Sequence, residues 1–114
     1  MSISNEINKK NILVIQLSEN SNSKKYQFYS NSNEVVEYLL DLYEEFLAEE
    51  NINQPEVKLV ELTDFLFFFY SFYDFAYLEY DETNSIYKPY GRDWFTDIIK
   101  SYFNYKSSYV LSRN

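Results

Sequence analysis

Two residue types on which enzymes commonly depend are missing from this sequence, which contains no cysteine and no histidine. Without cysteine there are no disulfide bonds, thiolate nucleophiles or thiolate metal sites. Without histidine there is no side chain whose ordinary pKa suits general acid–base catalysis near neutrality. The single glycine excludes a glycine-rich loop that cradles phosphates. We therefore predict a non-enzymatic protein with no catalytic residues, no metal site and no cofactor.

Basic residues and long apolar runs are also scarce. Lysine and arginine number 10 against 18 aspartates and glutamates, and the formal net charge is -8. Because affinity for nucleic acids comes largely from basic clusters that neutralise phosphates, this charge disfavours direct nucleic-acid binding. The most apolar stretch extends only from Phe65 to Tyr73, far short of the roughly 20 residues that cross a bilayer. We expect neither nucleic acid nor a membrane as a direct partner.

Aromatic residues, by contrast, are abundant. The 114 residues include 13 tyrosines, 10 phenylalanines and one tryptophan, and hydrophobic residues make up 46% of the chain. This length and composition fit one domain with a single core. Because a buried tyrosine needs a partner or water for its hydroxyl, so many tyrosines predict rings at the edge of the core or in an interface.

The first half of the chain shows two different hydrophobic periods. The β-branched run Asn11–Leu17 predicts a buried strand, and the alternation over Lys24–Phe28 predicts its hairpin partner. From Glu34 to Glu50 the apolar residues recur at helical spacing. Asn31, followed three residues later by Glu34, has the pattern of a capping box and predicts where this helix begins.

The segment from Leu62 to Tyr80 is ambiguous, because its aromatic content favours a strand while part of it fits one helix face. We divide it into a helix over Thr63–Asp74 and a strand over Phe75–Asp81. A returning strand is predicted over Ile86–Tyr90, and Asp93 is predicted to cap a final helix.

The predicted order is strand, strand, helix, helix, strand, strand, helix, in one domain over residues 11–106. Flexible tails are predicted at 1–10 and 107–114 because these ends are polar and show no periodicity. This order predicts an α+β fold in which an antiparallel sheet carries its helices on one face.

The string YKPYGRDW at residues 87–94 is similar to a known signature, YxPYxxDW. Other matching segments are ILVIQ at 12–16, Tyr26 with Tyr29, LYEEFL at 42–47, and residues 78–80. Together these segments resemble the enhancer of rudimentary family, in one register from about Ile12 to Lys106. The resemblance implies a four-stranded antiparallel sheet with three helices on one face.

The resemblance also implies a homodimer formed through the other face of the sheet. The expected dimer interface consists of Ile12, Val14, Gln16, Tyr26 and Tyr77, with Leu13 and Ile15 turned toward the helices. A strand that is apolar on both faces agrees with this, because the second face must be covered. The alternative is that Ile12 and Val14 are core residues of a sandwich-like monomer.

The function implied by the resemblance is that of a nuclear adaptor, with the cytoplasm as an additional compartment. Members of the family bind peptide segments of RNA-processing or transcription proteins, in splicing, selective elimination of transcripts or cell-cycle-linked regulation. The expected partner-binding residues are Tyr87, Tyr90, Trp94, Phe67 and Tyr70. For Trp94 the alternative is a purely structural role, as the anchor of the last helix on the sheet.

A departure from the family leaves a second function open. Phe67, Phe68, Tyr70 and Ser71 stand where the family's middle helix usually carries acids, so this surface is either covered or used for binding. The aromatic run could serve as a stacking platform for single-stranded RNA, but it has no lysine or arginine between Lys58 and Lys88. We therefore favour packing in the core and in an interface, with RNA binding as the alternative.

Overall fold

The computed structural model describes residues 9–50, 57–103 and 108–112. In chain order its elements are β1 (Asn11–Gln16), the short 3-10 helix η1 (Ser21–Ser23), β2 (Lys24–Tyr29), α2 (Ser32–Glu50), β3 (Val57–Glu61), α3 (Leu62–Tyr70), β4 (Asp74–Asp81), β5 (Ile86–Tyr90), α4 (Arg92–Tyr102) and β6 (Ser108–Ser112).

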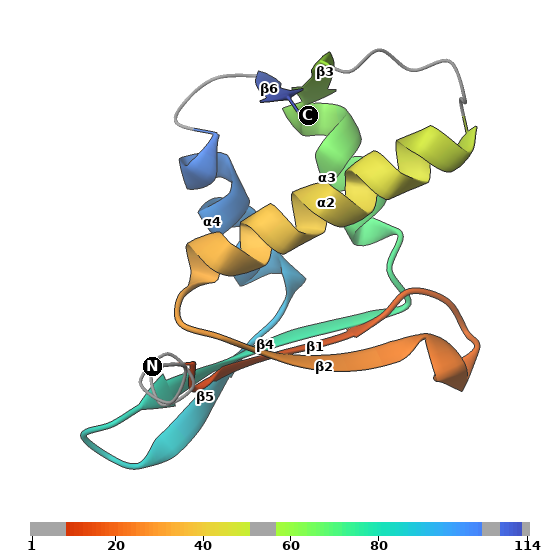
Figure 1. The fold of residues 1–114 in the computed structure, drawn as a ribbon. Coiled ribbons are helices and arrows are strands. Elements are labelled where there is room, and N and C mark those ends of the chain that lie inside the picture. Colours follow the sequence, from red (N-terminus) through yellow and green to blue (C-terminus); the bar gives the residue numbers. More distant parts are fainter. Residues whose placement is uncertain (1–8, 51–56, 104–107, 113–114) are drawn as a thin grey trace, which may run out of the picture.

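The main sheet has four antiparallel strands in the order β2-β1-β4-β5. Figure 1 shows α2, α3 and α4 on the same side of this sheet, with α2 crossing above the strands. The α+β fold with a four-stranded antiparallel sheet and three helices on one face is therefore confirmed. Within the described residues, no helix is long and apolar enough to cross a membrane.

A second, two-stranded sheet forms beyond the helices, where β3 pairs with β6 in antiparallel register (Figure 1). This pair was not predicted, and β6 (Ser108–Ser112) lies within the segment that was expected to be a flexible tail. The reason is physical: a short strand of this kind is stabilised by a partner some 50 residues away in the chain, Leu59 opposite Val110 for example, and local periodicity carries no sign of that partner. The predicted tail at 1–10 lies outside the described residues except for Lys9 and Lys10.

The start of α2 has the predicted Asn31 cap, and Glu34 reaches back to Ser30, one residue before the cap, in place of Asn31 itself. Asn31 Oδ1 accepts a hydrogen bond from the Glu34 backbone N at 3.0 Å, and Glu34 Oε1 accepts one from the Ser30 backbone N at 2.7 Å. Two backbone donors that the helix cannot satisfy by itself are thereby paired.

Replacement of Asn31 by alanine is expected to lower the free energy of unfolding by about 1 kcal/mol, because the Glu34 N–H loses its acceptor. Urea unfolding followed by circular dichroism measures the change. Asn33→Ala, two residues further on and exposed, is the matched control and should have little effect. Equal losses in the two variants would show that the cap contributes nothing specific.

Most boundaries differ from the predictions by one or two residues, and the end of the middle helix and the cap of the last helix differ more. The middle helix ends at Tyr70, and not at Asp74, because Ser71 N bonds to Phe68 O at 3.0 Å and tightens the last turn. Asp74 instead begins β4, opposite Gln16 of β1. The N-cap of α4 is Gly91, and no side chain caps it. The prediction that Asp93 caps this helix is wrong, since Asp93 lies inside the first turn.

Aromatic rings dominate the core between the sheet and the helices. Phe95 of α4 is fully buried, and its ring centroid lies 6.0 Å from that of Phe69, 5.2 Å from that of Phe75 and 5.6 Å from that of Tyr77. These contacts join α3, α4 and β4. The core therefore fixes both helices against one face of the sheet. In the part of the chain that the structure describes, the other face of the main sheet carries no helix (Figure 1).

Candidate interaction surfaces

The sheet face that points away from the helices is the first candidate surface. Residues directly opposite each other on antiparallel strands share a face. Val14 is paired with Tyr26 on one side and Ala76 on the other, and these alternate with the buried Leu13 and Ile15. We call this surface the outer face; it consists of Ile12, Val14, Tyr26, Phe28, Ala76, Leu78, Tyr80, Tyr87 and Pro89.

Large apolar side chains on the outer face are open to solvent. Tyr26 is 64% exposed, Phe28 57% and Tyr87 40%, and Ile12 and Val14 between them are partly exposed. An apolar surface that extends over four strands is typical of a protein–protein contact, because a lone protein would expose it to water. Phe28 and Leu78 were not predicted as members of this face. The alternation in residues 24–29 was the signal that could have placed Phe28 beside Tyr26.

Two of the expected interface residues have other roles. Tyr77 lies opposite Leu13 on the helix side and is fully buried, so its assignment to the outer face is wrong. Its hydroxyl oxygen accepts a hydrogen bond from Asn11 Nδ2 at 2.9 Å. Gln16 lies on the same side of β1 as Ile12 and Val14, but its side chain is only 7% exposed. The Gln16 amide donates a hydrogen bond to Ser18 O at 2.9 Å. Gln16 thus holds its own loop in place.

Burial raises the pKa of Tyr77 to about 12, while the hydrogen bond from Asn11 opposes the rise. A folded-state pKa above the unfolded value means that stability is complete below pH 10 and falls as the pH rises to about 12.

Between pH 10 and about 12 we expect the free energy of unfolding to fall by up to roughly 1.4 kcal/mol per pH unit. In this range Tyr77 loses its proton in the unfolded chain but keeps it in the folded one. The measurement is urea unfolding at a series of pH values, and Tyr77→Phe should show a shallower decline. Tyr73→Phe, at a position that is 57% exposed, is the control and should follow the unaltered protein. If the stability of Tyr77→Phe falls with pH as steeply as that of the unaltered protein, Tyr77 is not the group responsible.

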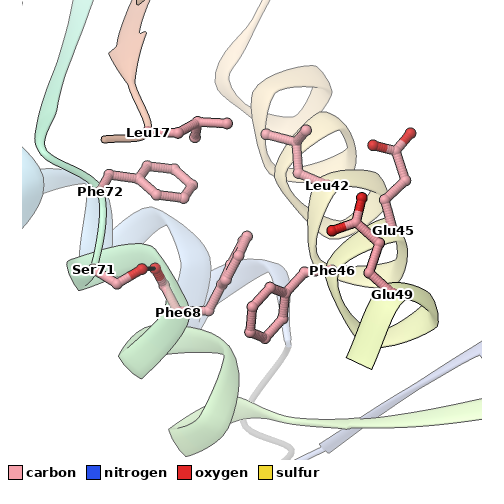
Figure 2. Close-up of a pocket in the computed structure, with 8 residues that line it drawn as sticks. All are labelled: Leu17, Leu42, Glu45, Phe46, Glu49, Phe68, Ser71 and Phe72. Atoms are coloured by element: carbon pink, nitrogen blue, oxygen red, sulfur yellow. Dashed lines mark hydrogen bonds between the residues drawn. The ribbon is translucent and has the colours of Figure 1, made fainter. Parts of the chain in front are cut away.

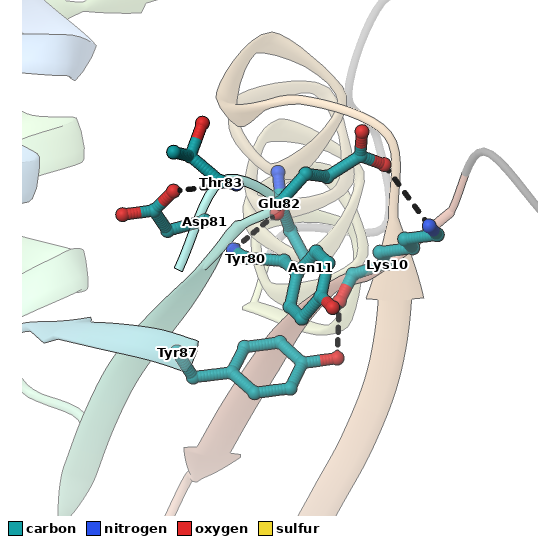
Figure 3. Close-up of polar contacts among 7 residues, drawn as sticks. All are labelled: Lys10, Asn11, Tyr80, Asp81, Glu82, Thr83 and Tyr87. Carbon is teal, nitrogen blue, oxygen red and sulfur yellow. Dashed lines mark hydrogen bonds and ion pairs between the residues drawn. The ribbon is translucent and has the colours of Figure 1, made fainter. Parts of the chain in front are cut away.

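Polar contacts hold the β4–β5 hairpin against the residue that precedes β1 (Figure 3). The Tyr87 hydroxyl donates to Lys10 O at 2.8 Å, and Lys10 Nζ lies 3.0 Å from Glu82 Oε1. The same ammonium group lies 5.2 Å from the ring centroid of Tyr80, a cation–π distance. Tyr80 and Tyr87 are therefore held in place at one end of the outer face.

Tyr90 and Trp94 pack against each other on the helix side of the sheet. Their ring centroids lie 3.9 Å apart with an interplanar angle of 19°, and Trp94 also stacks at 6.1 Å on the buried Tyr77. Both rings are partly buried. Trp94 thus anchors α4 on the sheet. This is the purely structural role that the sequence had offered as the alternative to partner binding. The predicted partner-binding residues do not form one site, because Tyr87 lies on the opposite face.

The two predicted partner-binding residues of α3 also differ in role. The Tyr70 hydroxyl donates to Asp93 Oδ1 at 3.1 Å, and Arg92 Nη1 donates to Tyr70 O at 3.1 Å. Tyr70 thus links the end of α3 to the start of α4. Phe67 is 82% exposed and lies beside the second candidate surface.

The second surface is a groove between α2 and α3, which we call the aromatic groove. It comprises two cavities of about 300 Å³ each that share Phe46, Phe68 and Ser71. Its other lining residues are Leu17, Leu42, Tyr43, Glu45, Glu49, Asp64, Phe67 and Phe72. Figure 2 shows Phe46 and Phe68 facing each other across the groove, with Glu45 and Glu49 along the α2 side. The aromatic residues of α3 stood out in the sequence, but the contact of Phe68 with Phe46 was not predicted.

Acidic side chains are numerous, yet in the described ranges no group of three or more of the side chains that usually bind metals lies close enough together to hold an ion. The two surfaces described above are apolar, and what they can do chemically is to exclude water against another surface.

Comparisons of this sequence with known proteins point to one family. The profile of the enhancer of rudimentary family matches residues 7–108 of this chain. The chain is also 28% identical, over 88 residues, to the protein described as Protein enhancer of rudimentary from Drosophila virilis, and the match covers 77% of this chain and 84% of that relative.

Proposed function

Because the chain belongs to the enhancer of rudimentary family, we propose that it acts as a homodimeric adaptor that binds peptide segments of nuclear RNA-processing or transcription proteins. The family is not an enzyme family, and the proposed activity is binding alone. The observation that supports the proposal is the outer face, an apolar surface on the side of the sheet opposite the helices.

A second copy of the chain is the occupant that best suits the outer face. The chain carries a net charge of -8, so two copies repel each other except where acidic residues are lacking. The nine residues named as the outer face are uncharged, and the charged Lys24 and Asp74, which lie on the same side of the sheet opposite Gln16, stand at one end of it. A two-fold arrangement brings the same patch of each copy together, so the apolar residues of one outer face would pack against those of the other.

Partner peptides would bind at places that the dimer leaves open. Strands β2 and β5 form the two edges of the sheet, and an extended peptide can add to such an edge or lie in a groove beside it. Tyr87 belongs to the edge strand β5 and so lies at the border of the outer face, where its exposed ring could contact a peptide added along that edge. The nucleus is the proposed location, with the cytoplasm as a further compartment.

Two measurements test the proposed function. Light scattering at micromolar concentration should give twice the chain mass of 13.8 kDa, and a pull-down from nuclear extract with mass spectrometry should recover RNA-processing or transcription proteins. A monomer, or recovery no different from beads alone, would refute the adaptor function.

Single-stranded RNA binding is the second candidate function, and the aromatic run of α3 is the observation that favours it. Labelled RNA titrated at low salt should show no saturable binding, because the acidic surface repels phosphates. Saturable binding that weakens as salt is added would favour the RNA-binding function instead.

A further inference from the structure

We propose that the aromatic groove between α2 and α3 binds a basic amphipathic helix of a partner protein. This inference rests on the adaptor function proposed above and names the kind of segment that the helix side of the molecule recognises. The groove is separate from the outer face, since the helices lie on the opposite side of the sheet (Figure 1).

The floor of the groove favours large apolar side chains. Phe46 and Phe68 lie with their ring centroids 5.2 Å apart, and Phe68 lies 5.0 Å from Tyr43 and 5.2 Å from Phe72. Both cavities are lined by Phe46 and Phe68, and each has lining residues of its own. Each cavity, about 300 Å³, has room for one bulky aliphatic or aromatic side chain. The occupant should therefore carry two such anchors on one face.

The charges at the rim select a basic partner. Glu45 and Glu49 line one cavity and Asp64 lines the other, and neither lining includes a lysine or arginine. Glu45 and Glu49 lie four residues apart on α2, so they form a row along one wall (Figure 2). Lysine or arginine residues beside the apolar anchors would pair with this row and with Asp64. An RNA strand or a second copy of this acidic chain would instead be repelled.

The walls of the groove favour a helix over an extended peptide. Both long walls are the sides of helices, α2 and α3, whose backbone groups already bond within each helix. An extended peptide would find no free strand edge there and would press unpaired backbone groups against aromatic rings. A helix satisfies its own backbone and presents anchors three, four or seven residues apart.

The probe is a fluorescein-labelled synthetic peptide of about 15 residues, with leucines at helical spacing on one face and lysines on the other. Fluorescence anisotropy with the intact dimeric protein should show saturable binding that weakens with added salt. Two control peptides separate the contributions. One has glutamate in place of each lysine, and the other has the same composition with the leucine stripe scrambled. Both should bind at least about tenfold more weakly.

Matched variants locate the binding. The double variant Glu45→Lys/Glu49→Lys should weaken binding of the lysine peptide at least about tenfold. The control Glu37→Lys/Asp97→Lys changes the net charge equally, at exposed positions outside the groove lining, and should retain most of the affinity. Phe67→Ala removes an exposed groove ring and should also weaken binding, whereas Tyr73→Ala, an exposed ring outside the lining, should not.

Several results would overturn the proposal. These are no saturable binding of the lysine peptide, equal binding of the glutamate peptide, or equal losses in the groove and control variants. A change of mass in light scattering on Phe67→Ala would show that a second copy occupies the groove. The groove variants are expected to leave the dimer mass unchanged, so failure here leaves the proposed dimer standing, and a monomeric native protein would count against that function alone.

Discussion

Replacement of Val14 by arginine is expected to convert the proposed dimer into a monomer. Val14 lies in the middle of the outer face, between Tyr26 of β2 and Ala76 of β4. In a dimer the new guanidinium would be buried without a partner, which costs about 3–5 kcal/mol. That cost corresponds to an increase in the dissociation constant of more than about a hundredfold.

The same substitution should leave each subunit folded. Val14 is partly exposed in the single chain, so the arginine can extend its stem along the sheet and keep its charge in water. A loss of mass with an unchanged circular dichroism spectrum would therefore report on the contact between copies and not on the fold.

Light scattering or sedimentation on Val14→Arg and on Ile12→Arg provides the measurement. Phe67→Arg is the control, since that residue is 82% exposed on α3, on the helix side of the molecule, and it should keep the mass of the unaltered protein. If both outer-face variants also keep that mass while remaining folded, the outer face is not where the two copies meet.

The second large effect is expected in the core, where Phe95→Ala should lower the free energy of unfolding by about 3–5 kcal/mol. Phe95 is fully buried, and its ring contacts Phe69, Phe75, Tyr77 and Trp94. Removal of the ring leaves a cavity that these fixed neighbours cannot fill. Because small domains are stable by only about 5–15 kcal/mol, the variant should retain little margin.

Urea unfolding of Phe95→Ala beside Phe67→Ala isolates this effect. The two variants delete the same atoms, but Phe67 is exposed and its removal should change stability by less than about 0.5 kcal/mol. Similar losses in both would mean that the rings around Phe95 are not closely packed in solution.

The elements that the sequence predicted well are those whose signal is local. The helix from Ser32 to Glu50 has a sustained helical period and a capping box, and both are properties of consecutive residues. The strand Ile86–Tyr90 was placed with its boundaries as observed. The ambiguous stretch after Leu62 was divided into a helix and a strand correctly, although the helix is shorter than predicted, because pairing with β1 draws Asp74 into β4.

The candidate sites were less predictable, since they depend on which surfaces meet. The family resemblance implied that Ile12 and Val14 point away from the helices and Leu13 toward them, and the structure has these residues on those two sides of β1. The face of Tyr77 was predicted wrongly, because the residues of a strand alternate between its two sides and a shift of one residue reverses every side chain. The aromatic groove requires Phe46 of α2 to face Phe68 of α3, and no local pattern relates those two positions.

The sequence by itself therefore determined the class of molecule: an acidic, aromatic-rich α+β domain without cysteine or histidine, with its main helix, its hairpins and its family signature recognisable. Only the tertiary structure decided that β3 pairs with β6, that Tyr77 is buried beneath α4, and that an acid-rimmed groove separates α2 from α3. The physical reason is the separation along the chain of the residues that interact. Periodicity and capping act between residues a few positions apart, whereas the strand pairing and the groove depend on contacts between segments distant in the chain, which form only once the core has packed.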